Sequence, residues 1–257
     1  MRTRVKAALS AGFKHLILSA LVASLAAAVV FGLWYPGAYS ALAGGRSLFL
    51  LLIAVDVVCG PLLTTIVYSP AKPRSELIRD IGIIVGLQFA ALVYGLYSVA
   101  QARPVYLGYE SGRFRVVSAA DIDPSSLSKA PEALRQLSWT GPRSLGVRLL
   151  GPEDPGYADS IVSALAGLPP AFRPERWLPY DQVTKRLQAD LNPMSMLKTK
   201  HPDAVAQIDA LMSSTGLAEN QVGYLPVEAE KAEPSDWVAV VQRDNGKPVG
   251  FLPITGW

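Results

Sequence analysis

The stretch LILSALVASLAAAVVFGLW, residues 16–34, decides the architecture of this chain, because it carries no charge over 19 residues. An α-helix needs about 20 apolar residues to cross about 30 Å of hydrocarbon, and this stretch reaches that length. Two further stretches match it: Ser47–Tyr68 has 22 residues with Asp56 as its one charge, and Ile81–Ala100 has 20 residues with none. The sequence therefore predicts a three-span α-helical membrane domain over residues 1–100.

The composition of the whole chain agrees with a membrane protein. Of its 257 residues 50% are apolar and 18% are charged, whereas soluble domains carry about 25% charged residues. The first 100 residues hold 8 Lys and Arg against 3 Asp and Glu, and the rest of the chain holds 16 against 18. The basic excess therefore flanks the apolar stretches, which indicates the lipid bilayer as a partner and argues against nucleic acid.

The basic residues also predict the orientation of the spans. Short flanks rich in Lys and Arg remain in the cytoplasm. Arg46 is the one basic residue between the first two spans, whereas the other two flanks carry several. We therefore expect a multi-pass protein of the bacterial inner membrane with a cytoplasmic N-terminus and a periplasmic part from Gln101 onward. The cytoplasmic basic residues are Arg2, Arg4, Lys6 and Lys14 before the first span, and Lys72, Arg74 and Arg79 after the second.

A cleaved signal peptide is the alternative for the first span, because Ala41-Leu42-Ala43 resembles a cleavage site. The apolar run is longer than the about 7–15 residues of a signal-peptide core. The break at Tyr35-Pro36-Gly37 also lies well before the cleavage site. Both readings leave the C-terminal half on the same side of the membrane.

Small residues recur every four positions in the first and third spans. This spacing lets helix backbones approach closely in lipid, so it favours packing within the bundle or against a partner helix. The residues are Ala20, Ser24, Ala28 and Gly32 in the first span and Gly82, Gly86 and Ala90 in the third.

Asp56 lies near the middle of the second span. An ionised carboxylate there costs at least about 2.5 kcal/mol, so we expect the side chain to face protein. At a rise of about 1.5 Å per residue, Gln88 and Tyr94 of the third span lie near its depth. Three roles stay open: an interhelical hydrogen bond, a contact to an incoming partner helix, and a proton relay. Gly60-Pro61 follows on the same helix and predicts a kink.

Residues 101–257 have the length of one domain, and their pattern predicts an α+β fold with an antiparallel sheet. One hairpin is expected over 104–118, and a second over 237–252 around Asp244-Asn245-Gly246. Between them we expect a strand over 145–150 and helices over 157–168, 181–191 and 202–213, the first with an apolar face of Ile161, Val162, Leu165 and Leu168.

Residue patterns for catalysis or metal binding are missing from the sequence. Cys59 is its one cysteine, and His15 and His201 are its two histidines, so no Cys/His zinc cluster can form. Only one imidazole falls in the exported domain, without a nucleophile motif beside it, and no phosphate-binding glycine motif occurs. We therefore predict no enzymatic activity, no cofactor and no metal site.

Three arginines border the first expected hairpin. We expect them on a solvated strand face, because charged residues beside a strand usually face water. A recognition surface is the second possibility. They are Arg103, Arg113 and Arg115.

Five stretches give a more specific indication together than any does alone. They are DVVCGPLLT (56–64), YGLYSVAQARPVY (94–106), RFRVVSAADI (113–122), YLP (224–226) and VGFLP (249–253). In these stretches the chain resembles the TfpX/TfpZ (FimB-like) type IV pilin accessory proteins. The resemblance implies a non-enzymatic inner-membrane chaperone that promotes pilus assembly, with a cognate type IV major pilin and other pilus-assembly proteins as partners. The alternative is an envelope-assembly or secretion scaffold unrelated to pili.

Overall fold

The computed structural model describes residues 2–257, with side chains from Thr3 onward, and the chain divides into two compact units. Unit 1 comprises the residues up to Trp34 together with Gly45–Gln101, and unit 2 comprises Tyr35–Gly44 together with Ala102–Trp257. The second part of unit 2 begins close to the domain boundary expected after residue 100. The segment 35–44, which the sequence placed in the loop between two spans, belongs to unit 2 as well.

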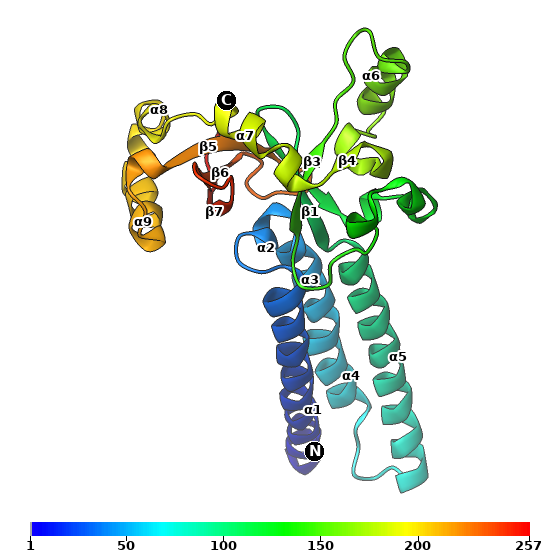
Figure 1. Ribbon diagram of the computed structural model, residues 1–257. Coiled ribbons are helices and arrows are strands. Elements are labelled where there is room, and N and C mark those ends of the chain that lie inside the picture. The colour runs from blue at the N-terminus through cyan, green and yellow to red at the C-terminus, as the bar shows by residue number, and fades with distance from the viewer. Residues whose placement is uncertain (1) are drawn as a thin grey trace. The chain divides into compact units, whose positions relative to one another are not determined.

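Unit 1 contains three helices that are long and apolar enough to cross a membrane, as the sequence predicted. Two of them contain π-helical segments, and all three extend beyond the apolar stretches into charged residues at their ends. The first span is α1 (Arg2–Val29) with η1 (Val30–Trp34); the second is α3 (Gly45–Ile53), η2 (Ala54–Cys59) and α4 (Gly60–Val67); the third is α5 (Arg74–Gln101), and Figure 1 shows them in blue to green.

Close approach of the spans depends on glycines that the sequence analysis did not single out. α1 packs along α4, and α5 packs against α3 and α4. A Cβ added at Gly12 of α1 would overlap the Thr65 hydroxyl of α4, and one at Gly95 of α5 would overlap Leu52 of α3. The packing inside unit 1 therefore uses single glycines at contact points.

Unit 2 is built on one seven-stranded sheet with the order β4-β3-β1-β2-β5-β6-β7 (Figure 1). The sheet is mixed: four neighbouring pairs are antiparallel, whereas β1 with β3 and β2 with β5 are parallel. The predicted antiparallel sheet is thus correct for most pairs and wrong for these two, because long connections allow parallel crossovers. The strands are β1 (Pro104–Tyr109), β2 (Phe114–Ser118), β3 (Arg143–Val147), β4 (Trp177–Leu178), β5 (Val222–Glu228), β6 (Trp237–Gln242) and β7 (Pro248–Leu252).

Both predicted hairpins are confirmed, as β1–β2 and β6–β7. The strand expected at 145–150 is β3 and begins two residues earlier. Two strands were not predicted: β4, which has only two residues, and β5, whose Pro226 argues against a strand.

Short helices join the strands of unit 2. Figure 1 shows α8 and α9 beside β5–β7, and α6 at the end of the sheet with β3 and β4. The sequence missed α8, because Pro193 and Pro202 enclose too short a stretch for a clear helical period. The helices are α2 (Tyr39–Leu42), α6 (Tyr157–Leu165), α7 (Thr184–Asp190), α8 (Met194–Lys200) and α9 (Val205–Thr215), with 3₁₀ turns at 119–121, 124–129, 132–134, 170–172, 174–176, 180–182, 202–204 and 219–221.

The core of unit 2 consists of two hydrophobic clusters, one at each end of the sheet. The first includes Tyr106 of β1 and Trp177 of β4, whose ring centroids lie 4.8 Å apart. The second packs Met194 of α8 and Ile208 of α9 against Tyr224 of β5. Each cluster includes side chains from strands of the sheet, so the helices and turns pack against the sheet and are stabilised by it.

The segment 35–44 is an integral part of unit 2. Tyr35 and Leu42 have no exposed surface. The Glu233 backbone N–H donates to the Ala41 carbonyl oxygen at 3.4 Å. Burial of this kind requires the loop between the first two spans to lie on the same side of the membrane as residues 102–257.

Candidate functional site: a cavity among the three spans

The second span changes its backbone register at Asp56. Residues Ala54–Cys59 form a π-helical segment, in which each carbonyl accepts from the amide five residues later. For the Asp56 carbonyl that amide would belong to Pro61, which has no N–H. The Gln88 side chain replaces it, because its Nε2 donates to the Asp56 carbonyl oxygen at 2.8 Å. Gly60 makes room for this bond, since a Cβ there would overlap the Gln88 amide.

Two acceptor oxygens at this position have no donor among the described residues. They are Oδ1 of the Asp56 carboxyl and Oε1 of the Gln88 amide, and both atoms are buried. Asp56 keeps only 8% of its surface exposed. The expected interhelical hydrogen bond therefore exists, but it goes to the Asp56 backbone and leaves part of the carboxyl without a partner.

Both side chains line a cavity of about 140 Å³ that receives residues from all three spans. We call it the Asp56 cavity. Its walls are apolar except at Asp56, Gln88, Ser19 and His15, and the His15 Nδ1 is hydrogen-bonded to the Thr64 hydroxyl at 2.6 Å. The other lining residues are Leu18, Val22, Ala23 and Ala26 of α1, Phe49, Leu52 and Ile53 of α3, and Val85, Phe89 and Leu92 of α5.

Tyr94 does not belong to this site. The sequence placed it near the depth of Asp56, but 73% of its surface is exposed and it does not line the Asp56 cavity. The rise along the helix predicts only the depth of a residue in the membrane. Its position around the helix axis decides which way the side chain points, and for Tyr94 that direction is outward. Asp56 is also the one carboxylate of the lining, so a proton relay lacks a second acidic group there.

The two stripes of small residues face away from the interior of unit 1. All seven residues are exposed, and a Cβ at the three glycines among them would meet nothing within 4 Å. Packing within the bundle is therefore excluded for these residues, and the surface they form is free for lipid or another helix. They are Ala20, Ser24, Ala28 and Gly32 on α1, and Gly82, Gly86 and Ala90 on α5.

Of the three arginines beside the first hairpin, Arg103 and Arg115 are buried, whereas the Arg113 side chain is 38% exposed. Arg103 is 4% exposed, donates from Nε to the Ser138 carbonyl at 3.0 Å, and lies 3.6 Å from the centre of the Trp139 ring. Burial lowers the pKa of Arg103 below its ordinary value. Arg115 is 8% exposed, so the expected solvated strand face is wrong for both residues.

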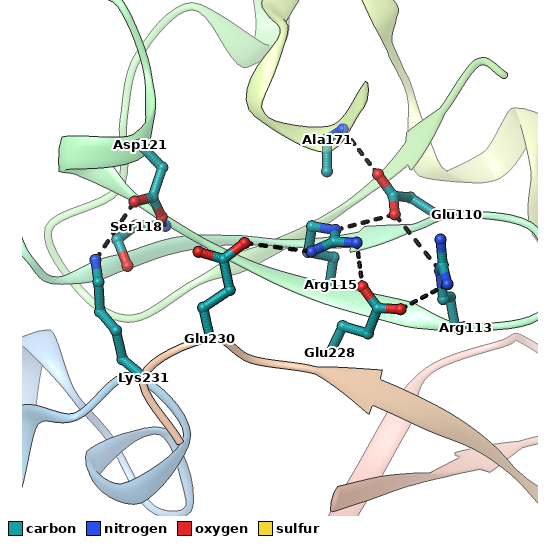
Figure 2. A network of polar contacts seen from close by, with 9 residues as sticks. All are labelled: Glu110, Arg113, Arg115, Ser118, Asp121, Ala171, Glu228, Glu230 and Lys231. Atoms are coloured by element: carbon teal, nitrogen blue, oxygen red, sulfur yellow. Dashed lines mark hydrogen bonds and ion pairs between the residues drawn. The ribbon is translucent and has the colours of Figure 1, made fainter. Parts of the chain in front are cut away.

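Arg113 and Arg115 instead belong to a network of ion pairs between β2 and the end of β5 (Figure 2). The Arg115 guanidinium contacts Glu110 at 3.0 Å and also contacts Glu228, while Arg113 contacts Glu228 at 2.5 Å. The buried Glu110 carboxylate accepts from the Ala171 backbone N–H at 2.8 Å. This arrangement fixes the parallel β2–β5 pair, and periodicity gives no sign of it because the partners are 113 residues apart.

Six tyrosines of unit 2 have a raised pKa, and for four of them the rise is large. For all four, burial is the largest cause, because it disfavours the charged phenolate. Tyr109 is additionally hydrogen-bonded to the Asp190 carboxylate, whose charge opposes ionisation. The four are Tyr35, Tyr39, Tyr109 and Tyr180.

The helix α6 carries an unpartnered apolar face. The sequence predicted one face of Ile161, Val162, Leu165 and Leu168, but these side chains are 44–84% exposed. Leu149, in the loop before α6, is another exposed apolar side chain. The amphipathic period therefore predicted the helix correctly up to Leu165, but Leu168 lies beyond the end of α6, and the period did not show what the apolar face covers.

Residues 2–257 contain no group of three or more His, Cys, Asp or Glu that could hold a metal ion. His201 lies in unit 2, where its Nε2 is hydrogen-bonded to the Thr255 carbonyl at 2.8 Å. That contact ties the end of α8 to the C-terminal residues, which is a structural role.

The spans and the sheet together define a three-span membrane protein with a mixed α+β unit, and no solved structure matches it. Two relatives from Dichelobacter nodosus align along most of the chain. The fimbrial assembly protein of serogroup I is 29% identical over 231 residues, which cover 90% of this chain and 89% of that protein. The one of serogroup E1 is 28% identical with the same coverage.

A third relative and a family model complete the assignment. The fimbrial assembly protein of serogroups C1 and C2 of Dichelobacter nodosus is 40% identical over 119 residues, which cover 46% of this chain and 88% of that protein. The model of the fimbrial assembly protein FimB matches residues 3–44. The chain belongs to the FimB family of fimbrial assembly proteins. The family is described by an assembly role and not by a reaction.

Proposed function

We propose that this protein is a non-enzymatic accessory protein of type IV pilus assembly, a chaperone for one cognate major pilin. Membership of the FimB family supports a role in pilus assembly and disfavours a scaffold unrelated to pili. The part played by a chaperone is to hold a pilin in the membrane until it is assembled. A weak, reversible contact suits that role better than a permanent one.

The observation that carries this proposal is the outward surface of unit 1. In the most apolar windows of the three spans only 17%, 28% and 11% of the residues are buried. The two small-residue stripes lie on this surface, and small residues allow a further helix to approach closely. Pairing of helices in lipid depends on such packing and on few hydrogen bonds, so a partner helix can be held and released. Unit 2 would then contact the pilin head and select the cognate pilin.

The proposed location is the bacterial inner membrane, with the N-terminus in the cytoplasm and unit 2 in the periplasm. Two observations support it. The flank before the first span and the loop after the second carry the basic residues. The segment 35–44 and residues 102–257 form one compact unit, so both belong on the other side. Alkaline phosphatase fused after Trp257 should be active, and fused after Arg74 inactive; the reverse result would contradict this orientation.

The function is tested by deleting the gene in the strain that carries its cognate pilin. Surface pili should fall while pilin transcription stays unchanged, and the wild-type gene should restore them. Crosslinkers on the stripes Ala20–Gly32 and Gly82–Ala90 report whether the bundle contacts the pilin helix, with Leu50 of the second span as the exposed control position. Normal piliation after deletion would refute the chaperone role.

A further inference from the structure

The Asp56 cavity contains buried polar atoms whose hydrogen bonding is incomplete. Inside hydrocarbon no water replaces a missing hydrogen-bond partner, so buried polar groups of membrane helices normally find partners in protein. Within residues 2–257, Asp56 Oδ1 and Gln88 Oε1 have none, although the Gln88 amide nitrogen donates to the Asp56 backbone carbonyl oxygen. The two residues that carry these acceptor oxygens line the same cavity from adjacent helices.

We infer that the Asp56 cavity receives one side chain of a partner transmembrane helix, and that this side chain ends in a hydrogen-bond donor, a hydroxyl or an amine, that bonds to Asp56 and Gln88. The inference rests on the proposed function for the identity of the partner, the pilin. The cavity is too small for a helix, since about 140 Å³ is close to the size of a cavity that holds a benzene molecule. It is large enough for one side chain, and its apolar walls can contact the apolar part of that side chain.

The chemistry of the cavity distinguishes this occupant from lipid. An acyl chain fits the apolar walls, but it has no donor and leaves both oxygens unbonded. A donor on a helix satisfies them, and the partner backbone keeps its own hydrogen bonds within its helix. The walls also remain open to a neighbour, because Val22 and Phe89 line the cavity and are themselves 38% and 66% exposed.

On α1, position around the helix separates this site from the small-residue stripe. On α5 it does not, because Phe89 and Gly82 are seven residues apart and share a face. Val22 lines the Asp56 cavity, whereas Ser24 belongs to the stripe of α1. With 3.6 residues per turn, two positions differ by about 200° around the helix. A single partner helix cannot contact both faces of α1 at once, so crosslinking can tell the two surfaces apart.

The experiment places a photoreactive amino acid at Val22 or Phe89 in the full chain, in cells that express the cognate pilin. Leu51 and Ile66 are the control positions, because both are exposed and neither lines the Asp56 cavity. Capture of pilin from Val22 and Phe89, and not from the controls, supports the inference. Capture of a second copy of this chain, or of lipid alone, overturns it.

Variants then test the chemistry, with the yield of pilin captured at Val22 as the measurement, because Val22 lies on a different face of its helix from the stripe. Asp56→Leu should lower the pilin yield about threefold to twentyfold, the range that one intramembrane hydrogen bond represents. Asp56→Asn keeps an acceptor oxygen and should stay within about twofold of wild type. If Asp56→Leu does not accumulate, alanine substitution of each donor residue in the captured pilin segment gives the same test. The chemistry is refuted if no such substitution lowers capture.

The two proposals fail in different ways. Capture of pilin from the stripes alone overturns the role of the Asp56 cavity and leaves the chaperone function intact. Normal piliation in the deletion strain, with no capture at any position, refutes the chaperone function itself.

Discussion

The two units of this protein treat a buried carboxylate in opposite ways. In unit 2, Glu110 is 2% exposed and is held by the Arg115 guanidinium and by a backbone N–H. In unit 1, Asp56 is buried among apolar walls, and its Oδ1 has no donor. A missing partner costs more in hydrocarbon than at the surface of a soluble domain. Unit 1 thus retains unpaired acceptors where they are most expensive, whereas the buried atoms of unit 2 that lack a hydrogen bond are Arg113 Nε, Arg176 Nε and the Tyr224 hydroxyl oxygen.

The two units also differ in what their polar side chains join. The ion pairs of unit 2 connect β2 to β5 within one sheet. Unit 1 has glycines at its helix contacts, a cavity with two free acceptors, and small residues on its outer face. The network therefore stabilises unit 2, and the features on which the proposed partner contact depends lie in unit 1.

The largest expected effect breaks the network of unit 2. Arg115→Met should lower the free energy of unfolding by about 3–5 kcal/mol, because it removes the nearest cation from the buried Glu110 carboxylate and leaves only the 3.7 Å contact with Arg113. The measurement is urea unfolding of the detergent-solubilised chain, followed by tryptophan fluorescence. Arg148→Met removes an exposed pair with Asp154 and should cost less than about 1 kcal/mol. Equal losses for the two variants would contradict a specific role for the network.

The next effect tests whether the loop 35–44 belongs to unit 2 in energetic terms. Leu42→Ala should destabilise unit 2 by about 2–5 kcal/mol, because the leucine is fully buried and its loss leaves a cavity. Leu165→Ala is the matched control, since that side chain is 84% exposed and its truncation should change stability by about 0.5 kcal/mol or less. The same unfolding curve serves for both, and a Leu42→Ala variant as stable as Leu165→Ala would exclude the loop from the core.

A smaller effect separates the glycines of unit 1 that pack from those that do not. Gly95→Ala should destabilise the bundle by about 1–3 kcal/mol, because the new methyl group overlaps Leu52. Gly86→Ala meets no atom and should leave stability equal or up to about 1 kcal/mol higher, since Ala is the better helix former. Helix content during unfolding in mixed micelles measures both. A destabilising Gly86→Ala would mean that this stripe packs within the bundle.

The smallest effect is the change in the pH dependence of stability when Tyr39 in loop 35–44 is replaced. Burial raises the pKa of Tyr39 above its ordinary value. Below pH about 10 the phenol is neutral in both states; above it the unfolded chain loses the proton first, so stability falls as pH rises. Tyr39→Phe should remove one such proton and reduce the loss by up to about 1.4 kcal/mol per pH unit above pH about 10. Tyrosinate absorbance during alkaline unfolding measures this, and an unchanged slope would place Tyr39 outside the core.

The sequence was most informative for features that depend on residues close to one another along the chain. Runs of apolar residues predicted the three spans, because their length must match the bilayer. The Asp244-Asn245-Gly246 turn predicted the β6–β7 hairpin in the same way. It was least informative for β5, because Pro226 disfavours a strand in local terms while pairing with β6 still accommodates it.

The candidate site was partly accessible from the sequence. Asp56, Gly60, Pro61 and Gln88 were named from depth and residue type, and the structure brings all four together. The direction of the bond was not accessible, since it depends on the π-helical register. The other lining residues were missed, because Val22 and Phe89 look like any apolar residue of a span.

The sequence by itself determined the three spans, the expected orientation and the absence of a catalytic pattern, since each depends on composition or on spacing along the chain. The tertiary structure alone decided that loop 35–44 packs in unit 2, that Arg115 is buried between two glutamates, and that the small-residue stripes face outward. The physical reason is that each of these features depends on which face of a helix or strand is covered. Which face of an element is covered depends on neighbours far away in the chain, and local periodicity carries no information about them.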